Sequence, residues 1–240
     1  NFFKKGGMFI SIISGGKGNI IRENKIGSGA DSLVAYGIEV ANCEGTLIEN
    51  NLIQNMKVTL SGSNQAMIGI ALDSGNNQII RNNVIKNIRA VSGYITAGIY
   101  VGVSGTNNQV YNNMVYDINS TSIQSNSRLA GIYLAYQTNP IIYYNSVYLL
   151  GGGATPLGSA ALYIYTSCTN IDAKNNIFIN TRDESTYCAS SIYDYSASNL
   201  ITDYNGLFYQ SNSNNALVRI GNTKYNTLTD WQTTGKDLHS

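Results

Sequence analysis

Apolar and polar residues alternate in short runs along this chain, and the runs return at a nearly constant interval. Within each run the apolar residues occupy every second position, which is the period of a β-strand and not of a helix. Each run leads to an asparagine that is followed two positions later by another apolar residue, and these asparagines are spaced 27 to 32 residues apart. The set is Asn24, Asn51, Asn83, Asn113, Asn145, Asn176 and Asn205. Such a period predicts stacked structural units.

A second repeating feature gives each unit at least two strands. It is a small residue followed by an apolar one, 14 or 15 residues before most of these asparagines. Three sets of apolar residues then align from unit to unit, and we expect them to point inward: Ile38, Ile70, Ile99, Ile132, Leu162 and Ile192; Val40, Leu72, Val101, Leu134 and Ile164; Ile26, Ile53, Ile85, Val115, Val147, Phe178 and Leu207. Because like residues align when turns stack in parallel sheets, the predicted fold is all-β, a parallel β-helix solenoid of about seven coils.

The repeated asparagine has a structural explanation. A coil must bend between strands, and asparagine tolerates the left-handed backbone conformation better than any residue except glycine. Its amide carries donors and an acceptor, so stacked asparagines can hydrogen-bond along the axis as a ladder. We therefore predict a structural Asn ladder in which these residues supply the left-handed bends.

These repeats resemble the right-handed parallel β-helix proteins of the pectate-lyase-like superfamily. The resemblance covers about residues 8–209, and residues 230–240 are similar to a connecting segment of large secreted bacterial members. It implies a β-helix over residues 1–209, a C-terminal connecting segment over 210–240 that leads to further coils, and a secreted or cell-surface location. The superfamily contains polysaccharide lyases, glycoside hydrolases, epimerases, adhesins and fibre proteins, so the fold leaves function open.

Composition and charge narrow the classes of partner. Only 12% of residues are charged and the net charge is +1. This charge does not favour binding to nucleic acid or to anionic lipid. The apolar runs are too short to insert in a membrane as spanning helices. The single histidine, His239, lies near the chain end, so Ser-His-Asp chemistry has no base inside the solenoid. We expect no cofactor and no metal site.

Three cysteines, Cys43, Cys168 and Cys188, leave at least one thiol unpaired within the chain. Their spacing does not match a zinc site. We expect buried or half-buried thiols, with a Cys168–Cys188 disulfide as the alternative.

One dense charged triplet is the candidate for catalysis. Arg182, Asp183 and Glu184 follow the sixth coil, and two carboxylates beside a guanidinium can serve acid–base work on a glycan. A solvated loop is the other interpretation.

A tyrosine column is the candidate for glycan binding. Tyr100, Tyr133, Tyr163 and Tyr193 follow the inward isoleucine column by one residue, so we expect an exposed strip whose rings stack on sugars. Tyr165 and Tyr195 stand two residues further on, and we expect the longer connecting segments to form a wall beside this strip. Stacked tyrosines can also merely stabilise strands.

The sequence therefore predicts a secreted or cell-surface β-helix with a structural or adhesive role and glycan contact along the tyrosines. Two alternatives stay open. One is a polysaccharide lyase or glycoside hydrolase. The other is a fibre subunit that associates end to end through open strand edges.

Overall fold

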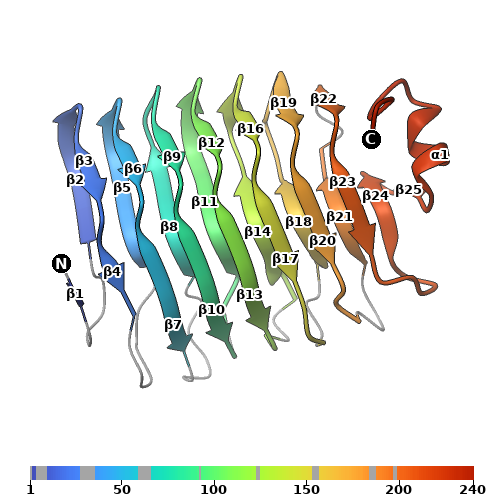
Figure 1. The fold of residues 1–240 in the computed structure, drawn as a ribbon, viewed down its shortest axis with the longest axis horizontal. Coiled ribbons are helices and arrows are strands. Elements are labelled where there is room, and N and C mark those ends of the chain that lie inside the picture. Colours follow the sequence, from blue (N-terminus) through green and yellow to red (C-terminus); the bar gives the residue numbers. More distant parts are fainter. Residues whose placement is uncertain are drawn as a thin grey trace.

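The chain forms one parallel β-helix in which three strands of each coil belong to three long sheets. A computed structural model describes residues 2–3, 10–27, 36–58, 66–91, 93–122, 125–152, 157–183, 188–196 and 199–240. Successive coils lie side by side along the long axis (Figure 1). Every pairing between coils is parallel and joins strands about 30 residues apart in the chain, as in the pairing of Val84 with Met114. The predicted fold class is confirmed.

The sheets are named here A, B and C. Sheet A contains β1 (Phe2–Phe3), β4 (Lys25–Ile26), β7 (Leu52–Val58), β10 (Val84–Ala90), β13 (Met114–Ser120), β17 (Ser146–Leu149), β20 (Ile177–Asn180) and β23 (Gly206–Tyr209). Sheet B contains β2 (Ile10–Lys17), β5 (Tyr36–Glu44), β8 (Met67–Ser74), β11 (Ile95–Thr106), β14 (Arg128–Leu134), β18 (Ser159–Ile164), β21 (Ala189–Asp194), β24 (Ala216–Ile220) and β25 (Thr223–Tyr225), and β15 (Gln137–Thr138) pairs with β11. Sheet C contains β3 (Ile20–Arg22), β6 (Leu47–Glu49), β9 (Ile79–Arg81), β12 (Gln109–Tyr111), β16 (Ile141–Tyr143), β19 (Ile171–Lys174) and β22 (Leu200–Asp203).

The core is a set of aliphatic stacks that run the length of the solenoid. The three predicted inward columns form it, and nearly all of their members are buried. Leu207, at the last coil, is only partly buried. Close approach of the sheets explains the glycine that precedes the isoleucine column. A Cβ on Gly69 would lie 2.6 Å from the carbonyl oxygen of Gly98 and 2.6 Å from Ile85 Cγ2.

The Asn ladder forms as predicted between sheets C and A. Each ladder asparagine donates from its side-chain nitrogen to the Oδ1 of the next, at 2.9 Å for Asn51 to Asn83 and 3.0 Å for Asn83 to Asn113. Its backbone N–H donates to the same oxygen, at 2.9 Å for Asn51. All of these amides point toward the C-terminal end, so the bonds form one polarised chain.

The predicted left-handed bend was placed one residue too late. The positive φ belongs to the residue before each ladder asparagine, as at Asn82 (φ 55°) and Tyr144 (φ 57°). The ladder asparagine instead turns its side chain into the buried stack, where Asn83 Nδ2 also donates to the carbonyl of Arg81 at 2.8 Å. The Asn-Asn pairs in the sequence therefore combine two roles, a bend followed by a ladder position.

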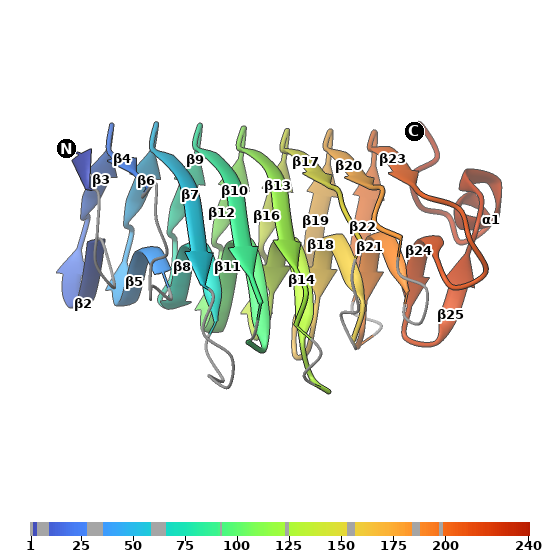
Figure 2. The same cartoon turned by 90° about the horizontal axis from the view of Figure 1, so that it is seen from below.

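The C-terminal segment folds over the last coil (Figure 2). Strand β24 extends sheet B in parallel, beyond the boundary predicted at residue 209, and β25 then pairs with it in the antiparallel direction. Helix α1 (Leu228–Gln232) begins with a capping box in which Asp230 N donates to Thr227 Oγ1 at 3.0 Å. Trp231, on this helix, is buried. Within the described ranges, no helix is long and apolar enough to cross a membrane.

Asp237 terminates the Asn ladder. Its Oδ1 accepts from Asn205 Nδ2 at 2.9 Å and from Ser240 Oγ at 2.7 Å, and its Oδ2 accepts from Trp231 Nε1 at 2.8 Å. An ionised carboxylate only accepts hydrogen bonds, so the chain of amide donors ends on a group that needs no further acceptor.

Candidate functional site

The outer face of sheet B carries one continuous column that changes chemistry along the axis. Strand register places its members on successive coils in the order Ser11, Glu39, Ala71, Tyr100, Tyr133, Tyr163, Tyr193 and Arg219. The N-terminal end is therefore acidic, the middle aromatic and the C-terminal end cationic. This face contains the candidate site.

The rings of the four predicted tyrosines are in contact along the column, with Tyr100, Tyr133 and Tyr163 stacked and Tyr193 tilted, but they are not an exposed strip. Ring centroids are 5.4 Å apart for Tyr100 and Tyr133, 5.3 Å for Tyr133 and Tyr163, and 4.9 Å for Tyr163 and Tyr193. Tyr133, Tyr163 and Tyr193 are only 1%, 0% and 3% exposed, while Tyr100 is half-buried. The predicted exposure was wrong because neighbouring segments cover the rings; the Tyr163 hydroxyl, for example, donates to the carbonyl of Leu157 at 3.4 Å.

The exposed rings belong to the second tyrosine column. Tyr195 is 48% exposed and its centroid lies 5.3 Å from that of Tyr165, which is half-buried. Tyr165 in turn lies 6.1 Å from Tyr133. The buried tyrosines thus form an aromatic floor, and Tyr165 and Tyr195 rise from it to the surface.

Two guanidinium groups lie on this aromatic surface. The guanidinium carbon of Arg128 is 4.1 Å from the ring centroid of Tyr165, and that of Arg219 is 4.6 Å from the centroid of Tyr193. Both are cation–π contacts, which fix a flat cation on a flat ring. Arg128 and Arg219 were not predicted from the sequence, because Arg128 lies outside the repeated columns and Arg219 stands where the column of tyrosines ends.

A carboxyl pair occupies the N-terminal end of the same face. Glu39 is 7% exposed, and its Oε2 accepts from Ser11 Oγ at 3.0 Å. Asp73, on the next coil, is half-buried. Burial raises the pKa of Asp73 to about 6, and the hydrogen bond and charge of Glu39 act in the same direction. Asp73 therefore holds its proton to a higher pH than an ordinary aspartate.

Two tyrosines flank the carboxyl pair. Burial raises the pKa of both Tyr36 and Tyr100 to about 12, and the charge of Asp73 adds to each shift. The pair could have been found in the sequence, because Glu39 and Asp73 both point outward from the same sheet on consecutive coils. The two carboxyl groups do not share a column, because strand register places Ala71 and not Asp73 beside Glu39.

The predicted catalytic triplet is not brought together as an exposed group. Arg182 is fully buried, and its guanidinium donates to Asn119 Oδ1 at 2.5 Å and to the carbonyl of Ser120 at 3.2 Å. Asp183 is exposed, where its Oδ1 accepts from Asn212 at 3.2 Å. Glu184 lies outside the described residues. Arg182 thus ties the segment after β20 to the end of β13, two coils away, because its long side chain reaches beneath the surface.

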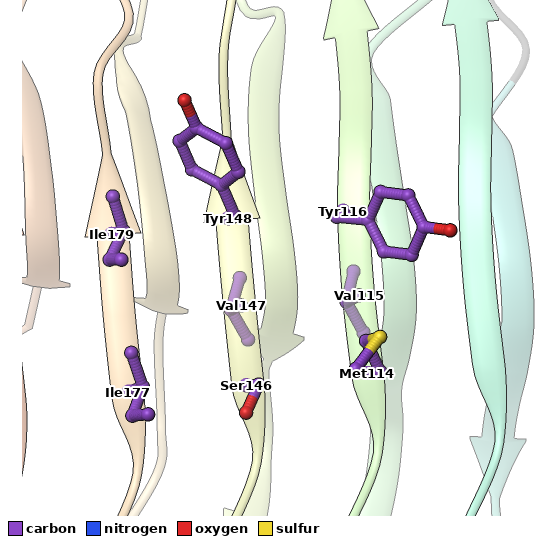
Figure 3. Close-up of a pocket in the computed structure, with 8 residues that line it drawn as sticks. All are labelled: Met114, Val115, Tyr116, Ser146, Val147, Tyr148, Ile177 and Ile179. Atoms are coloured by element: carbon purple, nitrogen blue, oxygen red, sulfur yellow. The ribbon is translucent and has the colours of Figure 1, made fainter.

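An open apolar groove lies on the outer face of sheet A. It encloses about 370 Å³ and is lined by Met114, Val115, Tyr116, Ser146, Val147, Tyr148, Ile177 and Ile179. Figure 3 shows the small Ser146 between the larger side chains of Met114 and Ile177 on the adjacent strands. Met114 and Ile177 are both about half exposed. This is the second surface that offers contact to a partner.

The cysteines form no metal or redox centre among the residues the structure describes. All three thiols are free and buried. Burial raises the pKa of Cys168 to about 11, which keeps its thiol protonated and unreactive. Over the described ranges, no group of three histidine, cysteine or acidic side chains is placed to hold a metal ion.

The three sheets, the aliphatic core and the Asn ladder define the protein as a parallel β-helix solenoid. Comparison with protein families agrees: the family described as right-handed beta helix region matches residues 12–223. The chain belongs to this family. Searches of curated proteins and of solved structures found no match.

Proposed function

We propose that this chain is a glycan-binding β-helix module with a structural or adhesive role, secreted or displayed at the cell surface. The binding surface is the outer face of sheet B around Tyr165 and Tyr195. The single observation that carries the proposal is the contact between these two rings, whose centroids are 5.3 Å apart and whose planes are tilted by 39°, with Tyr195 exposed at 48%. The location follows from the resemblance and from the low charge of the chain.

The chemistry of the surface suits sugars. Aromatic rings offer flat apolar faces to the C–H faces of a sugar ring, and tyrosine hydroxyls can exchange hydrogen bonds with sugar hydroxyls. The buried floor of Tyr133, Tyr163 and Tyr193 holds the exposed rings in place. A rigid floor reduces the ordering cost of binding.

A glycan array followed by calorimetry on the intact chain tests this proposal. Tyr195→Thr and Tyr165→Thr keep a residue that favours strands while removing the stacking faces. We expect each to weaken glycan binding about tenfold, or about 1.4 kcal/mol. Tyr148→Thr removes a ring of similar exposure from sheet A and is the matched control. Binding unchanged in both sheet B variants, or reduced equally in the control, would reject the proposal.

Polysaccharide hydrolysis is the second candidate, favoured by the carboxyl pair. Asp73, whose pKa burial raises to about 6, lies beside the carboxyl group of Glu39 on the same face. General acid–base attack on a glycosidic bond needs such a pair. Incubation with a polysaccharide panel should then release reducing ends, and Asp73→Asn and Glu39→Gln should each abolish the release. No release from any substrate would leave binding as the function.

A further inference from the structure

We propose that two copies of this chain associate side by side through the outer faces of sheet C, antiparallel along the solenoid axis, with a two-fold axis that runs along β12. The partner is therefore a second copy of the same chain. This proposal does not depend on glycan binding, because the proposed glycan surface is the outer face of sheet B. It starts from the order of the side chains on the seven strands of sheet C, which lie in a row along the solenoid (Figure 1).

The second outward residue of each sheet C strand belongs to a row that carries most of the charge on this face. From the N-terminal to the C-terminal coil, strand register gives the row as Arg22, Glu49, Arg81, Tyr111, Tyr143, Lys174 and Asp203. The signs are therefore plus, minus, plus, neutral, neutral, plus and minus. A two-fold axis along β12 keeps this row opposite the same row of the other copy and reverses the order of the coils.

Under this symmetry, each charge of the row meets an opposite charge or an aromatic ring. Arg22 of one copy faces Asp203 of the other, and Glu49 faces Lys174. Arg81 faces Tyr143, which is a cation–π pairing. Tyr111 lies on the axis and faces its own copy. Because the interface is isologous, each of these off-axis contacts occurs twice.

The charge order favours this register over its neighbours. A shift by one coil would place Glu49 opposite Asp203, and the same shift would place Arg81 opposite Lys174. A shift in the other direction would place Arg22 opposite Lys174. Like charges that face each other across an interface oppose association and suppress wrong registers. Of these three registers, the one centred on β12 is the favoured one.

The first outward residue of each strand supplies apolar contact in the same register. In coil order this second row is Ile20, Leu47, Ile79, Gln109, Ile141, Asp172 and Ile201. The two-fold axis pairs Ile20 with Ile201 and Ile79 with Ile141. Ile20 is 60% exposed and Ile201 is 48% exposed, so their contact would remove apolar surface from water.

Ion pairs within the chain hold several of these side chains in place before a partner arrives. Arg81 Nη2 lies 2.7 Å from Glu49 Oε2, and Lys174 Nζ lies 3.1 Å from Asp172 Oδ1. Side chains that are ordered in the free chain lose less entropy on association. The pairing of Asp172 with Lys174 also offsets its charge where the symmetry places it opposite Leu47.

The size of the face sets the expected strength of the dimer. Seven strands about 4.8 Å apart give a face about 30 Å long, and strands of two to four residues make it narrow. Such an area lies at the low end of specific interfaces. We therefore expect a reversible dimer with a dissociation constant in the micromolar range.

Gln109 provides the test, because it lies on the two-fold axis and faces its own copy. Sedimentation of the intact chain over a range of concentrations should show a monomer–dimer equilibrium. Gln109→Lys and Gln109→Glu each place like charges face to face, and each should weaken association about tenfold or more. An equal mixture of the two variants places opposite charges there and should associate at least as tightly as the unaltered chain. Gln54→Lys and Gln54→Glu, at a half-buried outward position of sheet A, are the matched controls and should leave association unchanged.

Three results would overturn the proposal. The first is a chain that stays monomeric up to about 1 mM, above the expected dissociation constant. The second is a dimer that neither Gln109 variant weakens, since the contact would then lie on another face. The third is a mixture that associates no better than each variant alone, since the copies would then not meet at β12. If the Gln109 variants do not fold, Arg22→Glu tests the same register at an exposed site: it should weaken the dimer about tenfold, whereas Lys25→Glu on sheet A should not.

Discussion

Replacing Asp237 with Asn tests whether the carboxylate at the end of the Asn ladder holds the C-terminal cap. Asp237 is fully buried and has a φ of 48°, a conformation that asparagine adopts readily. The substitution should therefore add no backbone strain. It replaces one carboxylate oxygen with an amide nitrogen, which is a donor and must face Trp231 Nε1 or the ladder donors of Asn205.

The expected loss of stability follows from the hydrogen bonds that the substitution breaks. If the amide oxygen of the variant stays toward Asn205 and Ser240, its amide nitrogen faces the buried indole N–H of Trp231. Two donors then oppose each other. Losing a hydrogen bond to a charged acceptor and orphaning its donor costs about 1.5–3 kcal/mol. The loss should appear first in the cap, since the coils before it keep their own ladder bonds.

Trp231 provides the assay, because it is the only tryptophan of the chain and is buried at the cap. In urea, Asp237→Asn should shift the tryptophan fluorescence transition to lower denaturant while the far-ultraviolet circular dichroism of the sheets changes less. Asp183→Asn, at an exposed carboxylate, is the control. Unchanged and coincident transitions in Asp237→Asn would refute the terminating role of the carboxylate.

Three further predictions concern the core, the carboxyl pair and a thiol. Ile99→Ala should lower the free energy of unfolding by about 2–5 kcal/mol, because the stacked column cannot collapse into the cavity, whereas a denaturant titration of Met114→Ala should show little change. Because the pKa of Asp73 is raised to about 6 in the folded state, its stabilising contribution is present below about pH 4 and is lost as pH rises through 6. After allowance for solvent screening, stability should fall by on the order of 1 kcal/mol across that window, and pH-dependent melts of Asp73→Asn should lack that fall. Cys168 should resist a thiol reagent at pH 8 in the native chain and react after unfolding; rapid native labelling would contradict its burial.

The fold was predictable because each coil repeats the same physical requirement. Ile38, Ile70 and Ile99 occupy one column since a parallel stack places like residues above one another. The ladder asparagines were predictable for the same reason. The position of the left-handed bend was not, because Asn-Asn pairs satisfy the sequence pattern with either residue in the bend.

The candidate site was only partly predictable, since it depends on residues that do not repeat. The tyrosine stack follows from strand register, but its burial depends on segments between coils, such as the one that contains Leu157. Arg128 and Arg219 approach the rings from different coils. The approach of Asp73 to Glu39 depends on side-chain reach across neighbouring strands, because strand register places Ala71 and not Asp73 beside Glu39.

In the apolar groove on the outer face of sheet A, the small Ser146 marks one position along an otherwise repetitive axis. On a solenoid with identical columns, a partner could slide by one coil and find an equivalent contact. Ser146 stands between Met114 and Ile177 in one column, so this coil offers a depression with a bulky side chain on each side (Figure 3). A partner side chain that binds in this depression would fix the position of the whole contact along the solenoid axis.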